Sequence, residues 1–328
     1  MPVYPPIRHD IAMGPQAIII DCDPGVDDGV ALLLALAVPT ELELLAITTV
    51  AGNVPLTSTA RNARILRTMA NREDVPVFAG ADRPLRRPPA FEAEHGPSAF
   101  HGATGLGSLP LVEPAGSLAA GHAADAIVRL VAERPAGTVT LVAVGPLTNV
   151  ALALQRDPGL ATSLQGIAIM GGARSAGGNI TASAEFNIYA DPDAAAVVFS
   201  SGARITAFGL DVTHQVRTTV ARLAAIDAIG SAQACAAANL LRFAHGVAEA
   251  MEREGAPIHD PCPIIWLLAP NLFQGRPAQV QVETLSDLTR GHTAVEFRVD
   301  PATAPVWWIT DVDADGVFAL LTDRLDRP

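Results

Sequence analysis

Cysteine is scarce in this 328-residue chain, in which only Cys22, Cys235 and Cys262 occur. An odd count of cysteines with no C-x-x-C spacing argues against a disulfide framework and against a cysteine-based zinc site. We therefore expect a protein of a reducing compartment, and we assign it to the cytoplasm.

Long apolar runs and a basic stripe are absent as well. No run of 18 uninterrupted apolar residues occurs, and Val30–Val38 is too short to span a bilayer. Residues 1–16 lack the apolar core of a signal peptide, so we interpret them as an irregular N-terminal extension. The net charge is −12, and without a basic stripe neither nucleic acid nor an anionic membrane is expected as a partner.

Strand-like and helix-like segments alternate as far as about residue 210. Hydrophobic residues make up 49% of the chain, which is ample for a large core. The clearest predicted strands are Leu42–Val50, Thr138–Val144, Gly166–Met170 and Ile205–Phe208. The alternation predicts an α/β fold with an open, doubly wound, mostly parallel central sheet, Rossmann-like, with helices on both faces. No linker divides the chain, so we expect a single domain over residues 1–328.

The stretch Ile18–Asp28, which reads I-I-I-D-C-D-P-G-V-D-D, concentrates four carboxylates at one junction. Three consecutive isoleucines are typical of a buried strand, Pro24 and Gly25 indicate a turn, and an apolar helical run then extends over Gly29–Val38. In open α/β sheets, ligands bind beyond the carboxyl ends of the strands. The four carboxylates are therefore expected at a binding site.

So much negative charge in one place needs a counter-charge. Ionised carboxylates this close would repel one another and raise each other's pKa. A hard divalent cation such as calcium, which takes about 6–8 oxygen ligands, removes the conflict. The alternative is structural: Asp27 or Asp28 caps the helix that follows, and the other carboxylates are solvated.

Two further polar residues in the first third of the chain are candidates for the site. Asn53 comes directly after the strand Leu42–Val50, where its amide could meet a sugar hydroxyl. His101 lies in a long loop, residues 82–107, that is rich in proline, glycine and charge and is a candidate lid. Their structural alternatives are turn formation for the asparagine and simple surface exposure for the histidine.

A glycine-rich loop after the strand Gly166–Met170 carries Asn179, Glu185 and Asn187. Amides and a carboxylate suit ribose hydroxyls, which both donate and accept hydrogen bonds. Farther along, the pair His259–Asp260 precedes a short apolar helix. The structural alternatives are turn-forming residues with one exposed glutamate for the loop, and core or capping residues for the pair.

Four motifs, in this order along the chain, resemble the inosine-uridine-preferring nucleoside hydrolases. They are D-C-D-P-G-V-D-D from Asp21, H-G-A-T-G-L from His101, the segment of about 24 residues from M-G-G-A to A-E-F-N-I-Y-A-D-P-D, and the pair His259–Asp260. The resemblance extends from about residue 18 to the C-terminus. It therefore involves almost the whole chain.

This resemblance implies hydrolysis of the N-glycosidic bond of a ribonucleoside to ribose and free base, with calcium as the cofactor. It assigns the calcium to Asp23, Asp28, Asp260 and the main-chain carbonyl of Val144, and it makes Asp23 the general base for a metal-bound water. It places the following residues around the substrate: Asp27, Asn53, His101, Asn179, Glu185 and Asn187. His259 would protonate or hydrogen-bond the departing base, and a homodimer or homotetramer is implied.

The region that would contact the base departs from the family pattern. Members that act on inosine and uridine often carry tyrosines on the helix before the His-Asp pair, where this chain has Phe243, His245 and Val247. The preference for purine or pyrimidine bases is therefore left open. Trp307 and Trp308 are expected in the core.

Three alternative functions compete with this interpretation. A phosphatase of the haloacid dehalogenase type also has D-x-D after its first strand, but it requires Thr or Val where Gly25 stands. A non-catalytic ribose-binding protein would keep the hydroxyl contacts without the base and the metal. A hydrolase of an unusual N-riboside would keep the whole site and differ only in its leaving group.

Overall fold

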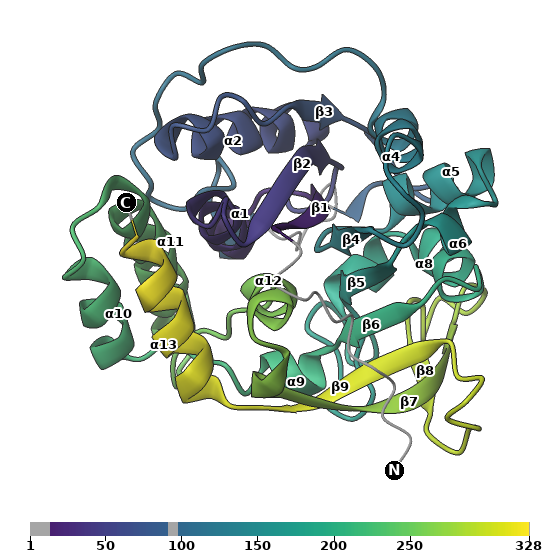
Figure 1. Ribbon diagram of the computed structural model, residues 1–328. Helices are drawn as coiled ribbons and strands as arrows, with labels where there is room; N and C mark the ends of the chain where they lie inside the picture. Colours follow the sequence, from purple (N-terminus) through teal and green to yellow (C-terminus); the bar gives the residue numbers. More distant parts are fainter. Residues whose placement is uncertain (1–13, 91–97, 328) are drawn as a thin grey trace.

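The computed structural model describes residues 14–90 and 98–327, and a nine-stranded sheet runs through it (Figure 1). The strand order is β3-β2-β1-β4-β5-β6-β9-β7-β8. The strands are β1 (Gln16–Cys22), β2 (Leu42–Thr49), β3 (Val77–Ala79), β4 (Val139–Ala143), β5 (Gly166–Met170), β6 (Ile205–Phe208), β7 (Phe273–Val282), β8 (Thr293–Glu296) and β9 (Val306–Val312). The seven strands from β3 to β9 in this spatial order pair in parallel with their neighbours. Strand β7 is antiparallel to both of its neighbours, β9 and β8. The predicted α/β, mostly parallel sheet is confirmed.

Helices cover both faces of the sheet (Figure 1). One face packs against α1 (Val26–Ala37), α2 (Leu56–Met69), α10 (Val220–Asp227), α11 (Ala232–Ala250), α12 (Pro261–Leu268) and α13 (Ala314–Leu325). The other packs against α4 (Ala123–Ala132), α5 (Thr148–Arg156), α6 (Leu160–Ser163) and α8 (Pro192–Phe199). Shorter elements join them: α3 (Ser98–His101), α7 (Phe186–Ala190), α9 (Leu210–Thr213) and the 3₁₀ helix η3 (Pro270–Leu272). The sheet is therefore doubly wound, as predicted.

Strand β1 lies at the centre of this arrangement, because its side chains pack into the hydrophobic cores on both faces of the sheet. Ile18 and Ile20 pack on the face of α1, whereas Ile19 packs on the face of α4 and α5. Strands buried on both faces are apolar throughout, which is why the three consecutive isoleucines form one. β2 pairs with one edge of β1 and β4 with the other, so the strand order reverses here. Such a switch point, at the carboxyl ends of the strands, is where ligands bind in this architecture.

Several boundaries differ from the predicted ones. Helix α1 begins at Val26 rather than Gly29, because Asp28 accepts a hydrogen bond from the N–H of Gly25 and closes the first turn. The alanine-rich stretch from Thr218 to Glu252, whose sequence pattern predicts helix throughout, divides into α10 and α11 at a turn where Gly230 has φ of +77°. The sequence pattern also predicts a strand over Val280–Glu283, whereas β7 begins at Phe273. Its first half is not apolar, because exposed polar residues such as Gln274 and Arg276 interrupt the buried ones.

Other predictions concern the ends of the chain, its loops and its tryptophans. Residues 1–13 of the predicted N-terminal extension and residues 91–97 of the predicted 82–107 loop lie outside the described residues. Gln16, which was assigned to the extension, is buried and opens β1. Trp308 is fully buried, as predicted, and Trp307 is partly buried against the core. The single-domain organisation stays a prediction.

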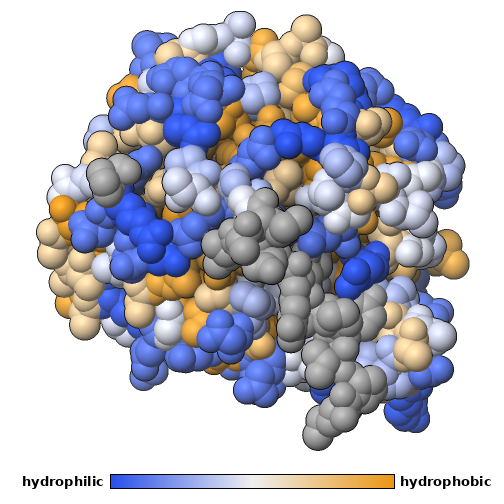
Figure 2. All heavy atoms as spheres, in the orientation of Figure 1, coloured by the Kyte–Doolittle hydropathy of each residue, from blue (hydrophilic) through white to orange (hydrophobic). Residues whose placement is uncertain are grey.

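The surface mixes polar and apolar side chains. Figure 2 shows hydrophilic residues interspersed with hydrophobic ones over the face in view. Among large hydrophobic side chains of the described residues, Leu285 and Leu288 in the β7–β8 loop are the most exposed. Within the same residues, no helix is both long and apolar enough to cross a membrane.

Candidate active site

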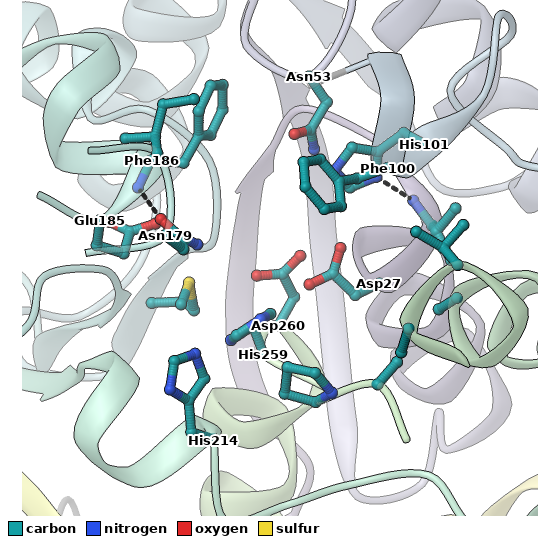
Figure 3. A pocket seen from close by; sticks show the side chains of 18 of the residues that line it. Asp27, Asn53, Phe100, His101, Asn179, Glu185, Phe186, His214, His259 and Asp260 are labelled. Carbon is teal, nitrogen blue, oxygen red and sulfur yellow. Dashed lines mark hydrogen bonds between the residues drawn. The ribbon is translucent and has the colours of Figure 1, made fainter. Parts of the chain in front are cut away.

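A pocket opens at the carboxyl ends of the central strands (Figure 3). Nine of the eleven predicted site residues line it: Asp27, Asn53, His101, Val144, Asn179, Glu185, Asn187, His259 and Asp260. The remaining two, Asp23 and Asp28, are almost completely buried and lie next to this lining through contacts with Asn53. Residues from distant parts of the sequence therefore meet in one pocket.

Asp28 holds the strand–turn–helix junction together. Its Oδ1 accepts the N–H of Asp23 at 3.1 Å, and its Oδ2 accepts the N–H of Gly25 at 3.0 Å. Oδ2 also accepts from the amide Nδ2 of Asn53 at 3.0 Å. The capping role weighed for Asp28 is thus real, and it leaves the carboxylate fixed at the base of the pocket.

Asp23 is confined between two glycines. Its Oδ2 accepts the N–H of Asn53 at 2.6 Å, whereas its buried Oδ1 has no hydrogen-bond partner among the described residues. A Cβ at Gly52 would lie 2.1 Å from Oδ2, and a Cβ at Gly145 would lie 2.6 Å from Oδ1. Only glycine fits at either position while this carboxylate keeps its place.

Three carboxylates form a cluster that can hold a metal ion. Asp27, Asp28 and Asp260 each offer one oxygen, and these oxygens lie within 4.8 Å of one another. Asp28 and Asp260 were predicted as ligands, whereas Asp27 was predicted to bind ribose and Asp23 is not part of this group. Figure 3 shows Asp27 and Asp260 side by side in the middle of the pocket.

The electrostatics of the cluster favour the binding of a cation. Burial, together with neighbouring carboxylates, raises the pKa of Asp28 to about 7 and raises the pKa of Asp260 and of Asp23 well above their usual range. Carboxyl groups are normally ionised near neutral pH, so a site that disfavours their charge gains from a cation. Together with the unpartnered Oδ1 of Asp23, this donor set suits a hard cation with oxygen ligands.

Glu185 and Asn187 form the wall opposite α1. Glu185 caps helix α7 and accepts the N–H groups of Gly172, Asn187 and Ile188, while burial raises its pKa to about 7. The Nδ2 of Asn187 donates to the carbonyl of Val144 at 2.8 Å. A carbonyl oxygen has a second lone pair, so Val144 can still accept a ligand.

Asn179 is held at the rim of the same wall. Its Oδ1 accepts the N–H of Phe186 at 2.9 Å (Figure 3). The Nδ2 of its amide is therefore the group left to donate to a ligand.

Three histidines lie around the pocket. The Nδ1 of His101 accepts the N–H of Val26 at 3.0 Å, which ties α3 to the start of α1. The Nδ1 of His259 lies 2.8 Å from Oγ1 of Thr213. Burial lowers the pKa of His101 and of His259, and burial with the neighbouring His259 lowers that of His214 to about 4. All three rings are therefore neutral near pH 7.

His214 and Phe100, which were not predicted as site residues, also line the pocket. The ring of His214 is 5.7 Å from that of His259, at an interplanar angle of 59°. His214 comes directly after α9, the short helix that follows strand β6, and no motif in the sequence marks it. Phe100 lies on α3, for which no regular element was predicted.

Comparison with known proteins now decides the family. A family model described as inosine-uridine preferring nucleoside hydrolase matches residues 18–319. The chain belongs to this family. A curated relative, the pyrimidine-specific ribonucleoside hydrolase RihA of Salmonella gallinarum, is 43% identical over 94% of this chain and 97% of its own length.

Solved structures agree with the sequence match. A plant nucleoside hydrolase superposes with a TM-score of 0.88 at 34% identity, covering 96% of this chain and all of its own. A purine-preferring ribonucleoside hydrolase from Gardnerella vaginalis also reaches 0.88, at 29% identity, covering 95% of this chain and 98% of its own. The predicted family, fold and enzyme class are confirmed: the chain is a hydrolase that cleaves the N-glycosidic bond of ribonucleosides.

Proposed function

We propose that the chain releases ribose from ribonucleosides with a calcium-bound water whose proton passes to Asp23, and that it prefers pyrimidine nucleosides. The observation that carries the mechanism is the meeting of Asp27, Asp28 and Asp260 within 4.8 Å, in a pocket otherwise lined by amides, a carboxylate and histidines. Hard oxygen donors of this kind are the ligands that calcium takes in proteins.

The residues that would hold calcium are Asp23, Asp28, Asp260 and the carbonyl of Val144, with Asp27 as a further donor from the same cluster. When bound, the ion supplies a coordinated water of lowered pKa and positions it for attack. Neutralising the buried carboxylates is its second effect, because their ionised forms are disfavoured by burial and mutual repulsion.

The reaction replaces the C1′–N bond of the nucleoside by a C1′–O bond. The water oxygen bonds to C1′ of the ribose, one water proton goes to Asp23, and the C1′–N bond breaks with its electron pair leaving on the base. The base then takes up a proton from solvent, and Asp23 releases its own proton to solvent. Oδ1 of Asp23 has no hydrogen-bond partner among the described residues and is the oxygen free to take the proton. The sugar carbon acquires oxocarbenium character, as in other glycosidic hydrolyses.

Ribose is held by donors and acceptors on both sides of the pocket. Asp27 and Asn53 reach it from the β1 and β2 ends, while Asn179, Glu185 and Asn187 reach it from the glycine-rich loop and α7. The proposed contacts use the amide atoms that the structure leaves open, such as the Nδ2 of Asn179. His101 lines the same side as Asn53 and closes the substrate site.

His259 would assist the leaving base. Burial lowers its pKa, so near neutral pH the ring is uncharged and acts as a hydrogen-bond donor to the departing base rather than as a charged acid. Pyrimidine and purine bases both carry acceptors for such a bond. The preference for pyrimidines rests on the relatives instead, since the pyrimidine-specific hydrolases are 43% identical and the purine-preferring structure 29%.

A reducing-sugar assay for ribose release tests the function directly. Uridine, cytidine, inosine, adenosine, guanosine and nitrophenyl riboside would each be supplied with calcium and after chelation. We expect calcium-dependent release that is fastest with uridine and cytidine, and loss of turnover in Asp23→Ala with the fold retained. Fastest release from a purine nucleoside would refute the base preference, and full activity after exhaustive chelation would refute the metal.

A second comparison isolates the role of His259. His259→Ala should lower turnover of uridine far more than turnover of nitrophenyl riboside, whose leaving group needs no assistance. Equal losses on both substrates would mean that His259 only shapes the pocket. If the unmodified enzyme releases ribose from nitrophenyl riboside and from none of the other nucleosides, an unusual N-riboside would be favoured as the natural substrate. The cytoplasmic location and the homodimer or homotetramer remain predictions, the latter measurable by light scattering.

A further inference from the structure

Thr213 contacts the face of His259 that points away from the pocket. It is the last residue of α9, it is fully buried, and it does not line the pocket. Its Oγ1 lies 2.8 Å from Nδ1 of His259, whose ring lines the pocket beside Asp260 (Figure 3). One ring nitrogen thus meets a protein hydroxyl, while the other is left for a ligand.

The positions of the protons in this contact follow from what surrounds it. A buried hydroxyl needs an acceptor for its hydrogen, and Nδ1 of His259 is the only hydrogen-bond partner of Oγ1 within the described ranges. If Nδ1 carried a hydrogen, Oγ1 would have to accept it, and the hydroxyl hydrogen would be buried without a partner. The arrangement that satisfies both groups has the threonine donating and Nδ1 accepting.

From this contact we infer that Thr213 is a positioning residue that holds His259 in the tautomer with the hydrogen on Nε2, the nitrogen that faces the departing base. The inference rests on the proposed role of His259. A neutral imidazole carries one N–H, and the partner of one nitrogen decides which nitrogen carries it. A carboxylate in place of Thr213 would accept from Nδ1 and leave Nε2 without a hydrogen, so a hydroxyl is the group that this role requires.

Removing the hydroxyl tests the inference. Thr213→Val keeps the shape of the side chain, lets the imidazole take either tautomer and frees its rotation. We expect kcat for uridine to fall about tenfold, the effect of one lost hydrogen bond, with KM changed little and nitrophenyl riboside hydrolysed at a rate within about twofold of the original. Thr213→Ser should restore the original ratio of the two rates, which a mere change in packing would not.

A second threonine–histidine pair supplies the matched control. Oγ1 of Thr218 lies 2.8 Å from Nδ1 of His245, and His245 does not line the pocket. Thr218→Val removes the same kind of contact elsewhere in the same region, together with the hydrogen bond that Oγ1 of Thr218 accepts from the N–H of Ala256 at 2.8 Å. We expect it to leave the ratio of uridine to nitrophenyl riboside turnover unchanged, with thermal unfolding recorded for both variants to compare their stabilities.

The tautomer can be observed without any turnover. In ¹⁵N-histidine-labelled protein, two-bond ¹H–¹⁵N spectra distinguish a protonated from an unprotonated ring nitrogen, and loss of signals in His259→Ala assigns the ring. We expect His259 to be protonated at Nε2 alone, in metal-free and calcium-loaded protein, and to lose this uniform state in Thr213→Val. A hydrogen on Nδ1 in the unmodified protein would overturn the inference.

The two proposals fail in different ways. If His259→Ala does not separate uridine from nitrophenyl riboside, the proposed role of His259 is wrong. If it does separate them but Thr213→Val does not, the role of His259 stands and the positioning role of Thr213 is refuted.

Discussion

Gly52→Ala should slow the enzyme strongly although it replaces none of the predicted site residues. The new Cβ would lie 2.1 Å from Oδ2 of Asp23 and 2.9 Å from Cδ of Pro146, where ordinary contacts begin at 3.4 Å. The carboxylate therefore has to move by roughly 1 Å, and a misplacement of that size costs on the order of 100-fold in rate. The move also breaks the 2.6 Å hydrogen bond from the N–H of Asn53.

The assay compares kcat for uridine with the free energy of unfolding. We expect kcat to fall about 100-fold, while overpacking lowers the free energy of unfolding by about 1–3 kcal/mol and leaves the protein folded at 25 °C. The matched control is Gly246→Ala on α11, where a Cβ meets nothing within 4 Å. It should keep the original kcat and gain about 0.5–1 kcal/mol of stability. A kcat for Gly52→Ala within threefold of the original would refute the confinement of Asp23.

Two further predictions concern pH. Burial raises the pKa of Asp28 from 3.8 to about 7, so between pH 3.8 and pH 7 the folded protein holds a proton that the unfolded chain has released. The melting temperature of chelator-treated protein should therefore fall from pH 5 to pH 8. Calcium should restore the melting temperature at pH 8. A melting temperature that rises over this range without calcium would contradict the reasoning. Burial likewise raises the pKa of Asp21 to about 7. Asp21→Asn should therefore gain stability relative to the unmodified protein as the pH rises from 5 to 8, by at most about 3 kcal/mol. A difference that does not depend on pH in paired thermal melts would contradict this prediction.

The sheet and the location of the site were predictable because they depend on local patterns. Ile18–Ile20 is apolar on every side chain, which marks a strand buried on both faces, and P-G after it marks the turn. Parallel strands end at one edge of a sheet, so Asn53 after β2 and the carboxylates after β1 had to lie near each other. Nine predicted residues do line one pocket for this reason.

The features that were missed depend on contacts between distant segments. His214 follows a short strand in a stretch with no strong motif, and only the fold shows that its ring lies 5.7 Å from that of His259. The confinement of Asp23 by Gly52 and Gly145 is equally hidden, because a glycine in sequence does not reveal which side chain its missing Cβ makes room for. The grouping of Asp27 with Asp28 and Asp260 follows from the turn of α1, which begins three residues earlier than predicted.

The four carboxylates of the first motif lie in different environments, and the geometry of strand and helix explains why. Side chains along a strand alternate between its faces, so Asp21 points with Ile19 towards α5, where its Oδ1 accepts from Thr48 and Asn149. It therefore ties β1 to β2 and α5 and stays out of the pocket. Asp23 stands beyond the last residue of the strand, and Asp27 and Asp28 lie in the first turn of the helix that follows. The turn before this helix directs the N–H groups of Asp23 and Gly25 at the carboxylate of Asp28, so the backbone stabilises part of the negative charge that the chain gathers there.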